Sequence, residues 1–387
     1  MGIFSSNKPH LAIVIDVGSS SIGAASVLMY PNEKPKIIHS VRSEMVFQEV
    51  FRFERFVVSM IESVEKVMQE LSHLPVPPHS DRTFLCVLAS PWYASQTRIL
   101  RKTFDRPTKI EEKFLNEIHE KEIASFRAKE MNIMGGDSVI LEMESVQTKL
   151  NGYETTKPFG KEAIDFETAM YVSISPRKIT QAISDKIQKA FHGKDLHFSS
   201  FPFASFVTMR DIFHEKNFLL MDISGETTDV SIIRSDVFQE TVSFNVGKNF
   251  LIRKIAKEAG STFAEAASLF RMASGSEMNE VEEKVKKAMK KAGEEWIAEC
   301  EQALSTILER KEILPGDVFL TADEDVSAWF IGNVQELGNS SFSMSSNVFS
   351  VRHLNAPFLS SFCATDTGVE RDAFLMVESL FASRLIH

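Results

Sequence analysis

Two apolar runs in the chain end in an aspartate and a turn of small residues. The first extends from Leu11 to Asp16, and the second from Phe218 to Asp222. Each run predicts a buried strand, and the apolar stretches that follow, 22–29 and 228–233, predict the returning strands. The order of apolar run, aspartate, polar turn and strand therefore occurs twice, as an internal repeat.

Helical periodicity marks the longer segments between and after these runs. Apolar residues recur every three or four positions, which is typical of amphipathic helices. Leu74-Pro75-Val76-Pro77-Pro78 interrupts the pattern, because proline lacks an amide donor and fixes φ, and we place a domain boundary there. The predicted helices cover 53–71, 176–191, 281–307 and 369–381.

The stretch 83–168 has a pattern of its own. Strands are predicted at 84–89, 139–147 and 169–174, and a charged run at 109–130 favours helix. Asn151-Gly152 is a hairpin signal. These signals predict a small α+β module over 83–168.

Composition excludes several classes of protein. With 387 residues, 43% hydrophobic and 25% charged, the chain is neither disordered nor fibrous. A net charge of −10 argues against nucleic-acid binding. No run of about 18 apolar residues predicts a transmembrane segment. The three cysteines form no metal or disulfide pattern and fit the cytosol. Met1 to Ser6 matches the myristoylation pattern, which is too short to be specific.

The residue types in the repeated turns are suited to binding phosphate and Mg²⁺. Successive backbone amides in such a turn can cradle phosphate oxygens, and small residues let the phosphate approach. The preceding aspartate is placed to hold Mg²⁺ through water. One turn alone is better explained as an ordinary β-hairpin with a surface aspartate. The matching pair favours two lobes that clamp one nucleotide.

Several segments, taken in order, resemble the actin-like ATPase superfamily, and within it the bacterial proteins of the FtsA/PilM type. Ile13 to Ile22 resembles the first phosphate loop, and Leu220 to Asp229 the second. Shorter matches lie at 156–160, 201–205, 245–250 and 264–266.

The resemblance implies a two-lobed α/β fold with the α+β module inserted in the first lobe. Residues 1–82 would form the first part of that lobe, 83–168 the module, and 169–235 the rest of the first lobe and the start of the second. Residues 236–350 would complete the second lobe, and 351–387 would return to the first.

The family further implies ATP and Mg²⁺ as ligands, with Mg²⁺ held through water by Asp16 and Asp222. The residues expected around the nucleotide are Asp16, Gly18, Ser19, Ser20, Asp222, Ser224, Gly225, Thr227, Thr228, Gly247 and Thr321.

The function it implies is a cytosolic adaptor of a membrane-associated machine, in type IV pilus assembly or cell division. Its partner would be a cytoplasmic peptide of an inner-membrane protein, gripped by the module and the adjacent lobe, and self-association stays open. Two alternatives remain: a nucleotide-free scaffold with a degenerate site, and a true ATPase or small-molecule kinase. No residue stands out as a catalytic base.

The chain departs from the family pattern at the nucleotide motifs. Ser224 and Glu226 replace glycines of the second loop, and Glu226 adds a negative charge where phosphate would lie. The adenosine motif reads Thr321-Ala322-Asp323-Glu324, where glycines are usual. These changes predict weak or no ATP binding and hydrolysis. The closing helix also lacks the basic face of a membrane anchor, which favours the PilM side of the family.

Three other features have plain interpretations. The lysine-rich run 280–291 predicts a solvated helix face rather than a nucleic-acid site. His192 and His197 have no metal-ligand spacing and predict loop histidines. Trp92-Tyr93 is equally compatible with a partner contact and with the core.

Overall fold

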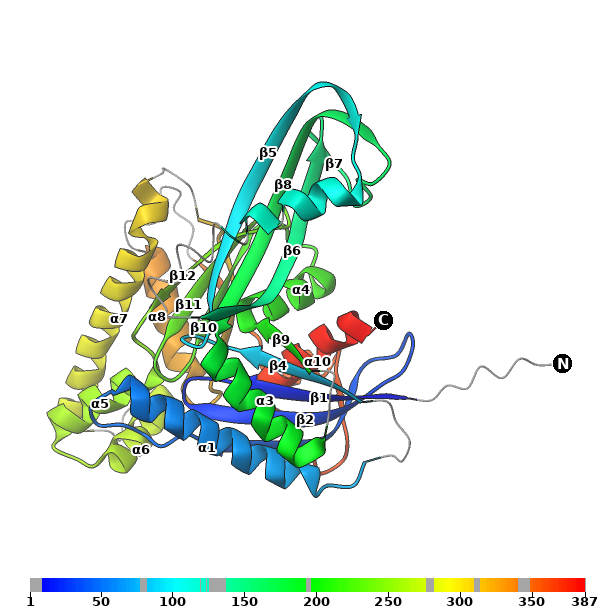
Figure 1. Cartoon of the computed structure of the whole chain (residues 1–387). Coiled ribbons are helices and arrows are strands. Elements are labelled where there is room, and N and C mark those ends of the chain that lie inside the picture. Colours follow the sequence, from blue (N-terminus) through cyan, green and yellow to red (C-terminus); the bar gives the residue numbers. More distant parts are fainter. Residues whose placement is uncertain are drawn as a thin grey trace.

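In the computed structural model the described residues form three β-sheets, two of which form the lobes and one a module (Figure 1). The strand orders are β15-β3-β2-β1-β4-β9, β12-β11-β10-β13-β14 and β5-β8-β6-β7. The structure describes residues 9–76, 82–118, 120–122, 124, 137–192, 196–275, 282–309, 314–339 and 349–386.

The first lobe is a six-stranded sheet with helices on both faces. In β1, Leu11, Ile13 and Ile15 pack with one pair of helices, α1 and α3, whereas Ala12 and Val14 pack with α4 and α10. This alternation is the period-2 pattern of a strand buried on both sides. Its elements are β1 (His10–Val17), β2 (Ser21–Met29), β3 (Lys36–Glu44), α1 (Phe53–Ser72), β4 (Arg82–Leu88), α3 (Arg177–Phe191), β9 (Leu196–Ser200), α4 (Phe201–Ile212), α9 (Ala356–Leu359), β15 (Ala364–Thr365) and α10 (Ala373–Ile386).

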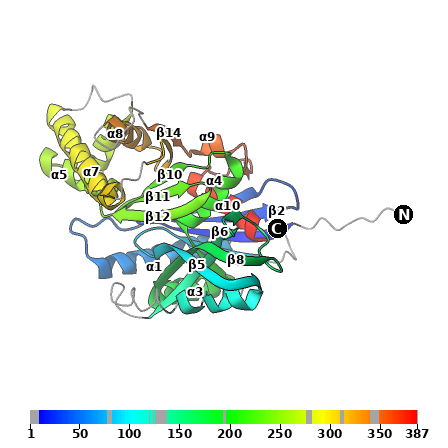
Figure 2. The same ribbon diagram turned by 90° about the horizontal axis from the view of Figure 1, so that it is seen from above.

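The second lobe repeats the hairpin of the first at the centre of its own sheet. Its helices α5, α7 and α8 lie at one end of the molecule, away from the module strands (Figures 1 and 2). One core cluster joins the sheet to these helices around Trp296 and Phe330. The elements are β10 (Phe218–Ile223), β11 (Thr228–Arg234), β12 (Val237–Phe244), α5 (Lys248–Ala259), α6 (Phe263–Ser274), α7 (Glu283–Glu309), β13 (Asp317–Ala322), α8 (Ser327–Asn339) and β14 (Ser350–His353).

The module is a separate antiparallel sheet that projects from the lobes (Figure 1). A helical segment at 112–118 covers it through a small cluster around Phe166 and Leu115. Its strands are β5 (Ala94–Lys109), β6 (Ser138–Leu150), β7 (Tyr153–Glu154) and β8 (Glu162–Pro176).

The module strands differ from the predicted ones at both ends. β4 lies in the first-lobe sheet, beside β1 and parallel to it, because Phe84 to Leu88 is a buried apolar run. β8 continues to Pro176, so the module sheet covers 94–176 rather than 83–168. The division of the chain into the predicted domains otherwise stays a proposal.

The apolar strands of the two hairpins and the long helices α1, α3, α7 and α10 were predicted, whereas β3, β5, β9, β12, α4 and α8 were not. β5 is polar and largely exposed along its length, so it lacks the alternation that marks a half-buried strand. The predicted helix over 109–130 is described as helix only from 112, since Lys109 ends β5. Gly135-Gly136, the start at Met1 to Ser6 and residue 281 lie outside the described residues.

Candidate functional site

The two predicted turns face each other where the lobes meet. Each joins the two strands of an antiparallel hairpin, in which the aspartate opposes a residue of the returning strand, Gly23 for Asp16 and Asp229 for Asp222. Ser19 Oγ lies 2.7 Å from Ser224 Oγ, across the boundary between the lobes. The fold therefore brings the two halves of the repeat into direct contact.

Most of the predicted site residues gather around one small cavity between the turns. Its volume is about 20 Å³, close to what a single water needs. The predicted residues that line it are Asp16, Gly18, Ser19, Ser20, Asp222 and Ser224.

The other predicted residues lie behind this cavity. Thr321 Oγ1 donates to Asp222 Oδ1 at 2.7 Å, and Thr228 Oγ1 donates to the carbonyl of Val246 at 2.7 Å. Thr227 Oγ1 donates to the carbonyl of Ser90 at 3.1 Å.

Two glycines allow the turns to approach closely. A Cβ on Gly225 would lie 2.5 Å from Ser20 Cβ and 2.9 Å from the Ser19 carbonyl oxygen. A Cβ on Gly247 would lie 2.4 Å from the Ser224 carbonyl oxygen. Glycine at position 225 therefore allows contact between the lobes, and glycine at position 247 allows close contact within the second lobe.

The aspartate of the first turn is paired with an arginine. Arg42 on β3 reaches Asp16 Oδ2 at 2.7 Å and Asp372 Oδ2 at 2.6 Å. Its guanidinium crosses β2 at Gly23, where a Cβ would be 2.5 Å from Arg42 Nη2. Burial raises the pKa of Asp16 to about 6, although Arg42 opposes this effect.

A second carboxyl group lies beneath this pair. Glu378 on α10 is fully buried, and no N–H or O–H group of the described residues donates to its oxygens. Burial and the adjacent Asp16 raise the pKa of Glu378 well above its ordinary value. In its protonated form Glu378 can donate a hydrogen bond to the Asp16 carboxylate.

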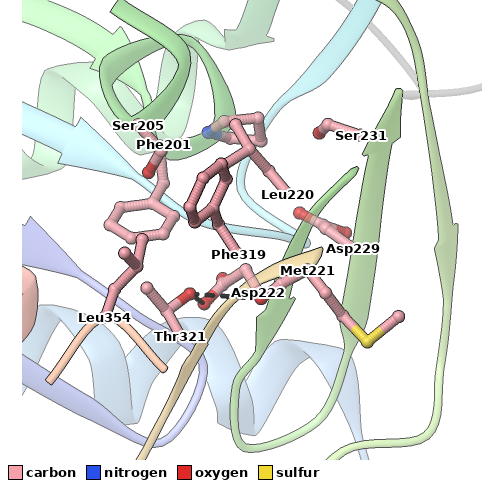
Figure 3. Close-up of a pocket in the computed structure, with 11 residues that line it drawn as sticks. Phe201, Ser205, Leu220, Met221, Asp222, Asp229, Ser231, Phe319, Thr321 and Leu354 are labelled. Carbon is pink, nitrogen blue, oxygen red and sulfur yellow. Dashed lines mark hydrogen bonds between the residues drawn. The ribbon is translucent and has the colours of Figure 1, made fainter. Parts of the chain in front are cut away.

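The second hairpin also carries two buried carboxyl groups. Asp222 and Asp229 lie opposite each other on β10 and β11, next to a cavity of about 10 Å³ that Phe201 and Phe319 cover with apolar side chains (Figure 3). Asp229 Oδ2 accepts from Ser90 Oγ at 2.8 Å and from Tyr93 Oη at 2.9 Å.

The pKa values of both carboxyl groups are raised. For Asp222 the main cause is burial, followed by the charge of Asp229, and for Asp229 the main cause is burial.

Two acidic residues that depart from the family pattern, Glu226 and Asp323, have partners inside the second lobe. Glu226 accepts from Asn249 Nδ2 at 2.9 Å and from Arg253 Nη1 at 3.1 Å. Lys248, at the start of α5, forms an ion pair with Asp323. Burial lowers the pKa of Lys248, but Asp323 outweighs this effect and the net shift is upward. The carboxylate of Glu226 is thus directed to α5 and away from the cavity.

Sequence reasoning missed the cations that neutralise these acids, Arg42, Lys248 and Arg253. Each is a single basic residue in an otherwise ordinary strand or helix pattern. One signal was available for Arg42, because a glycine inside a strand, here Gly23, marks a close approach of another group.

ATP with Mg²⁺ does not fit between the turns as they are arranged here. The cavity holds about one water, and Ser19 already accepts from the amide of Glu226 at 2.9 Å. The described residues contain no group of three or more metal-ligand side chains placed to hold a metal ion.

A larger groove lies between the module and the lobes. Its volume is about 1070 Å³, and β6 forms one wall with Met143 to Thr148. Arg210, Phe213 and His214, at the end of α4 and just beyond it, form part of the other wall. In the described part of the sheet only β7 lies beyond β6, and it pairs there at Lys149 and Leu150.

The remaining sequence signals have structural explanations. Trp92 and Tyr93 are core residues, since Trp92 stacks on Phe56 at 4.7 Å and Tyr93 is 6% exposed. His192 ends α3 in the left-handed conformation, and His197 lies in β9. None of the described helices has the length and apolar character to cross a membrane.

These features define the class of fold, that of the actin-like ATPases, with two lobes built around matching hairpins. The solved PilM-PilN type IV pilus biogenesis complex is similar to the chain at 14% identity over 97% of this chain and 96% of that one, with a TM-score of 0.60. The fold predicted from the sequence motifs is confirmed.

Two looser overlays have the same coverage of this chain. The ethanolamine utilization protein EutJ from Carboxydothermus hydrogenoformans is 13% identical over 97% of this chain and 90% of that one, with a TM-score of 0.44. The MamK double helical filament is 11% identical over 97% and 98%, with a TM-score of 0.47. No family profile and no curated protein sequence matches the chain. At these identities the likeness shows the fold alone.

Proposed function

We propose that the chain is an adaptor that holds an extended peptide of a membrane-associated partner in the groove beside the module. The observation that supports this most directly is the groove itself, at about 1070 Å³ with β6 along one wall. An extended peptide can add to such a strand edge through backbone hydrogen bonds, while pockets alongside select its side chains.

The charges on the two walls of the groove favour a peptide of mixed character. The module side carries Glu112, Glu144 and Glu154, whereas the lobe side carries Arg210 and Lys216, with Asp236 paired to Lys216 at 3.5 Å. Opposite charges on facing walls would orient a bound segment and select against segments of the reverse polarity. Exposed Phe159 and partly exposed Phe213 add apolar contact area.

The fold resemblance supports a particular setting for this role. In the solved complex PilM pairs with PilN in type IV pilus biogenesis. By analogy, the partner here would be the cytoplasmic segment of an inner-membrane protein, which would keep the adaptor in the cytoplasm at the membrane. A pilus assembly complex is the favoured setting, and a cell division complex is the alternative.

Nucleotide has a secondary place in this proposal. If ATP with Mg²⁺ binds, the lobes must first separate, and Asp16, Asp222 and the turn amides would then be the groups that face it. The groove does not depend on such an opening, so the adaptor role needs neither turnover nor a catalytic base.

Peptide binding tests the adaptor role directly. The probe is a fluorescent library of the cytoplasmic N-terminal segments of the host's single-span membrane proteins, titrated with the intact chain. We expect at least one segment to bind with a Kd in the micromolar range and Phe159→Glu to weaken it at least about tenfold, or 1.4 kcal/mol.

Val50→Glu is the control, because Val50 is also an apolar residue, is 72% exposed and does not line the groove. Binding that Val50→Glu weakens while Phe159→Glu leaves it intact would place the peptide elsewhere. No binding by any segment would count against the adaptor role.

A further inference from the structure

The contact between the two turns is a continuous hydrogen-bond relay. The amide of Glu226 donates to Ser19 Oγ at 2.9 Å, and Ser19 Oγ lies 2.7 Å from Ser224 Oγ. Ser224 Oγ in turn donates to the carbonyl of Thr227 at 3.1 Å. Because the Ser19 oxygen already accepts from the amide, its own proton is available for Ser224. A backbone amide of the kind that would cradle a phosphate is therefore satisfied by the other lobe.

The packing of the two turns also leaves no room for a phosphate group between them. Gly225 is so close to Ser20 that even a methyl group has no room between them. A phosphate group is larger than a methyl group, so the turns must move apart before one can enter. The closed arrangement excludes the ligand by direct backbone contact.

The charges that a nucleotide would need are also engaged. Asp16 is neutralised by Arg42, which is held on its other side by Asp372. Lys248 is paired with Asp323, and Arg253 with Glu226. A phosphate chain would have to break these pairs in a partly buried site, where an unpaired charge is costly.

Further contacts hold the lobes together on either side of the turns. Asp229 of the second lobe accepts from Ser90 and Tyr93, which follow the first-lobe strand β4. At the other side Arg253 Nη1 donates to the carbonyl of Gln48 at 3.2 Å, and the ring of Phe47 lies 4.9 Å from that of Phe263. The turn contact is thus part of a wider interface between the lobes.

We propose that the repeated turns act as a clasp, defined as residues 18–20 and 224–227, that binds the two lobes to each other in place of a nucleotide. The closed arrangement is then the resting state of the ligand-free protein. Mg²⁺-ATP at millimolar concentration neither enters the clasp nor opens it.

A cross-link across the clasp tests this inference. In Ser19→Cys/Ser224→Cys the two thiols replace hydroxyls that are 2.7 Å apart, so mild oxidation with diamide should join them. The native Cys86, Cys300 and Cys363 are buried, and burial raises the pKa of each thiol, so they compete poorly. The two single variants are the controls.

We expect the disulfide to form rapidly in most molecules without nucleotide, at the same rate with Mg²⁺-ATP present. Slower cross-linking in Mg²⁺-ATP would show that nucleotide opens the turns and would overturn the clasp. Failure to cross-link in a folded double variant would overturn it as well, because the turns would then not be in contact.

If the double variant does not fold, calorimetry on the unmodified chain tests the clasp instead. Titration with Mg²⁺-ATP should give no binding heat up to millimolar concentration. Micromolar binding that Asp222→Ala abolishes would establish a working nucleotide site and refute the clasp. Neither result bears on peptide binding, so the adaptor role can fail or stand independently.

Discussion

The small cavity between the turns, here called the cleft, differs from the groove beside the module in how much space it leaves for a ligand. The cleft encloses about 20 Å³, and its acidic groups are bonded to neighbouring residues of the protein. The groove has about 1070 Å³ and walls that carry side chains open to solvent. The part of the chain that carries the repeated motif is thus used for internal contact, while the inserted module supplies the free surface.

The largest effect on stability is expected from Arg42→Met. The substitution leaves Asp16 and Asp372 buried or nearly so without their cation, above a third acid, Glu378. Loss of one partner from a buried ion pair costs about 3–5 kcal/mol, to be measured by urea unfolding. Arg101→Met is the control, because the Arg101 side chain is 73% exposed and such pairs contribute less than about 1 kcal/mol. Equal effects of the two would contradict a buried pair.

Gly225→Ala should have the next largest effect. Its methyl group would overlap Ser20 in the clasp, and overpacking of this kind costs about 1–3 kcal/mol. Gly332→Ala in α8 is the matched control, since a Cβ there meets nothing within 4 Å and alanine favours a helix by about 0.5–1 kcal/mol over glycine. Thermal melting of both variants would measure the difference. If Gly225→Ala melts like the native chain, the turns are not in contact.

A smaller effect, confined to a pH range, is expected from Glu142→Gln. Glu142 of β6 accepts from the amide of Ser200 at 3.1 Å, where the module meets α4, and burial raises its pKa from 4.5 to about 7. The folded state then binds the proton more tightly than the unfolded one. The stabilisation that comes from this tighter proton binding is complete below about pH 4.5, falls as the pH rises towards 7, and stays low above pH 7.

Glutamine should remove this slope and stabilise the protein at pH 8, by about 1–2 kcal/mol, relative to the native chain. Unfolding curves from pH 4 to 8 would show it. Glu162→Gln is the control for the loss of one carboxylate, because Glu162 is exposed. A parallel profile for Glu142→Gln and the native chain would mean that folding does not raise the pKa of Glu142.

The smallest effect on stability is expected in the groove. Phe159→Glu changes a side chain that is 54% exposed, so the unfolding free energy should move by less than about 0.5 kcal/mol. The same variant should weaken peptide binding at least about tenfold, whereas folded Gly225→Ala should retain it. Measuring stability and binding for both variants would separate the two regions. The reverse pattern would assign the peptide to the cleft.

The fold was predictable because its central strands and long helices are strongly apolar and periodic. The hairpins of β1–β2 and β10–β11 also placed the turns correctly within each lobe. The individual segments do not show which side chains meet at the site in the folded structure. The pairing of Asp16 with Arg42 depends on β3, a half-buried strand with a weak pattern, and on Asp372 near the end of the chain. The direction of Glu226 depends on Arg253, one turn into α5.

The closing segment of the chain completes the sheet with which the chain begins. β15 pairs with β3 at Ala364 and Lys36, and α10 covers the face formed by Ala12 and Val14. During synthesis, part of one apolar face of the first lobe therefore stays exposed until α10 has left the ribosome. Contacts this distant in sequence slow folding and expose the nascent chain to aggregation. Chaperones have the greatest opportunity to act on this protein in that interval, and truncation before Ala373 should yield an insoluble product.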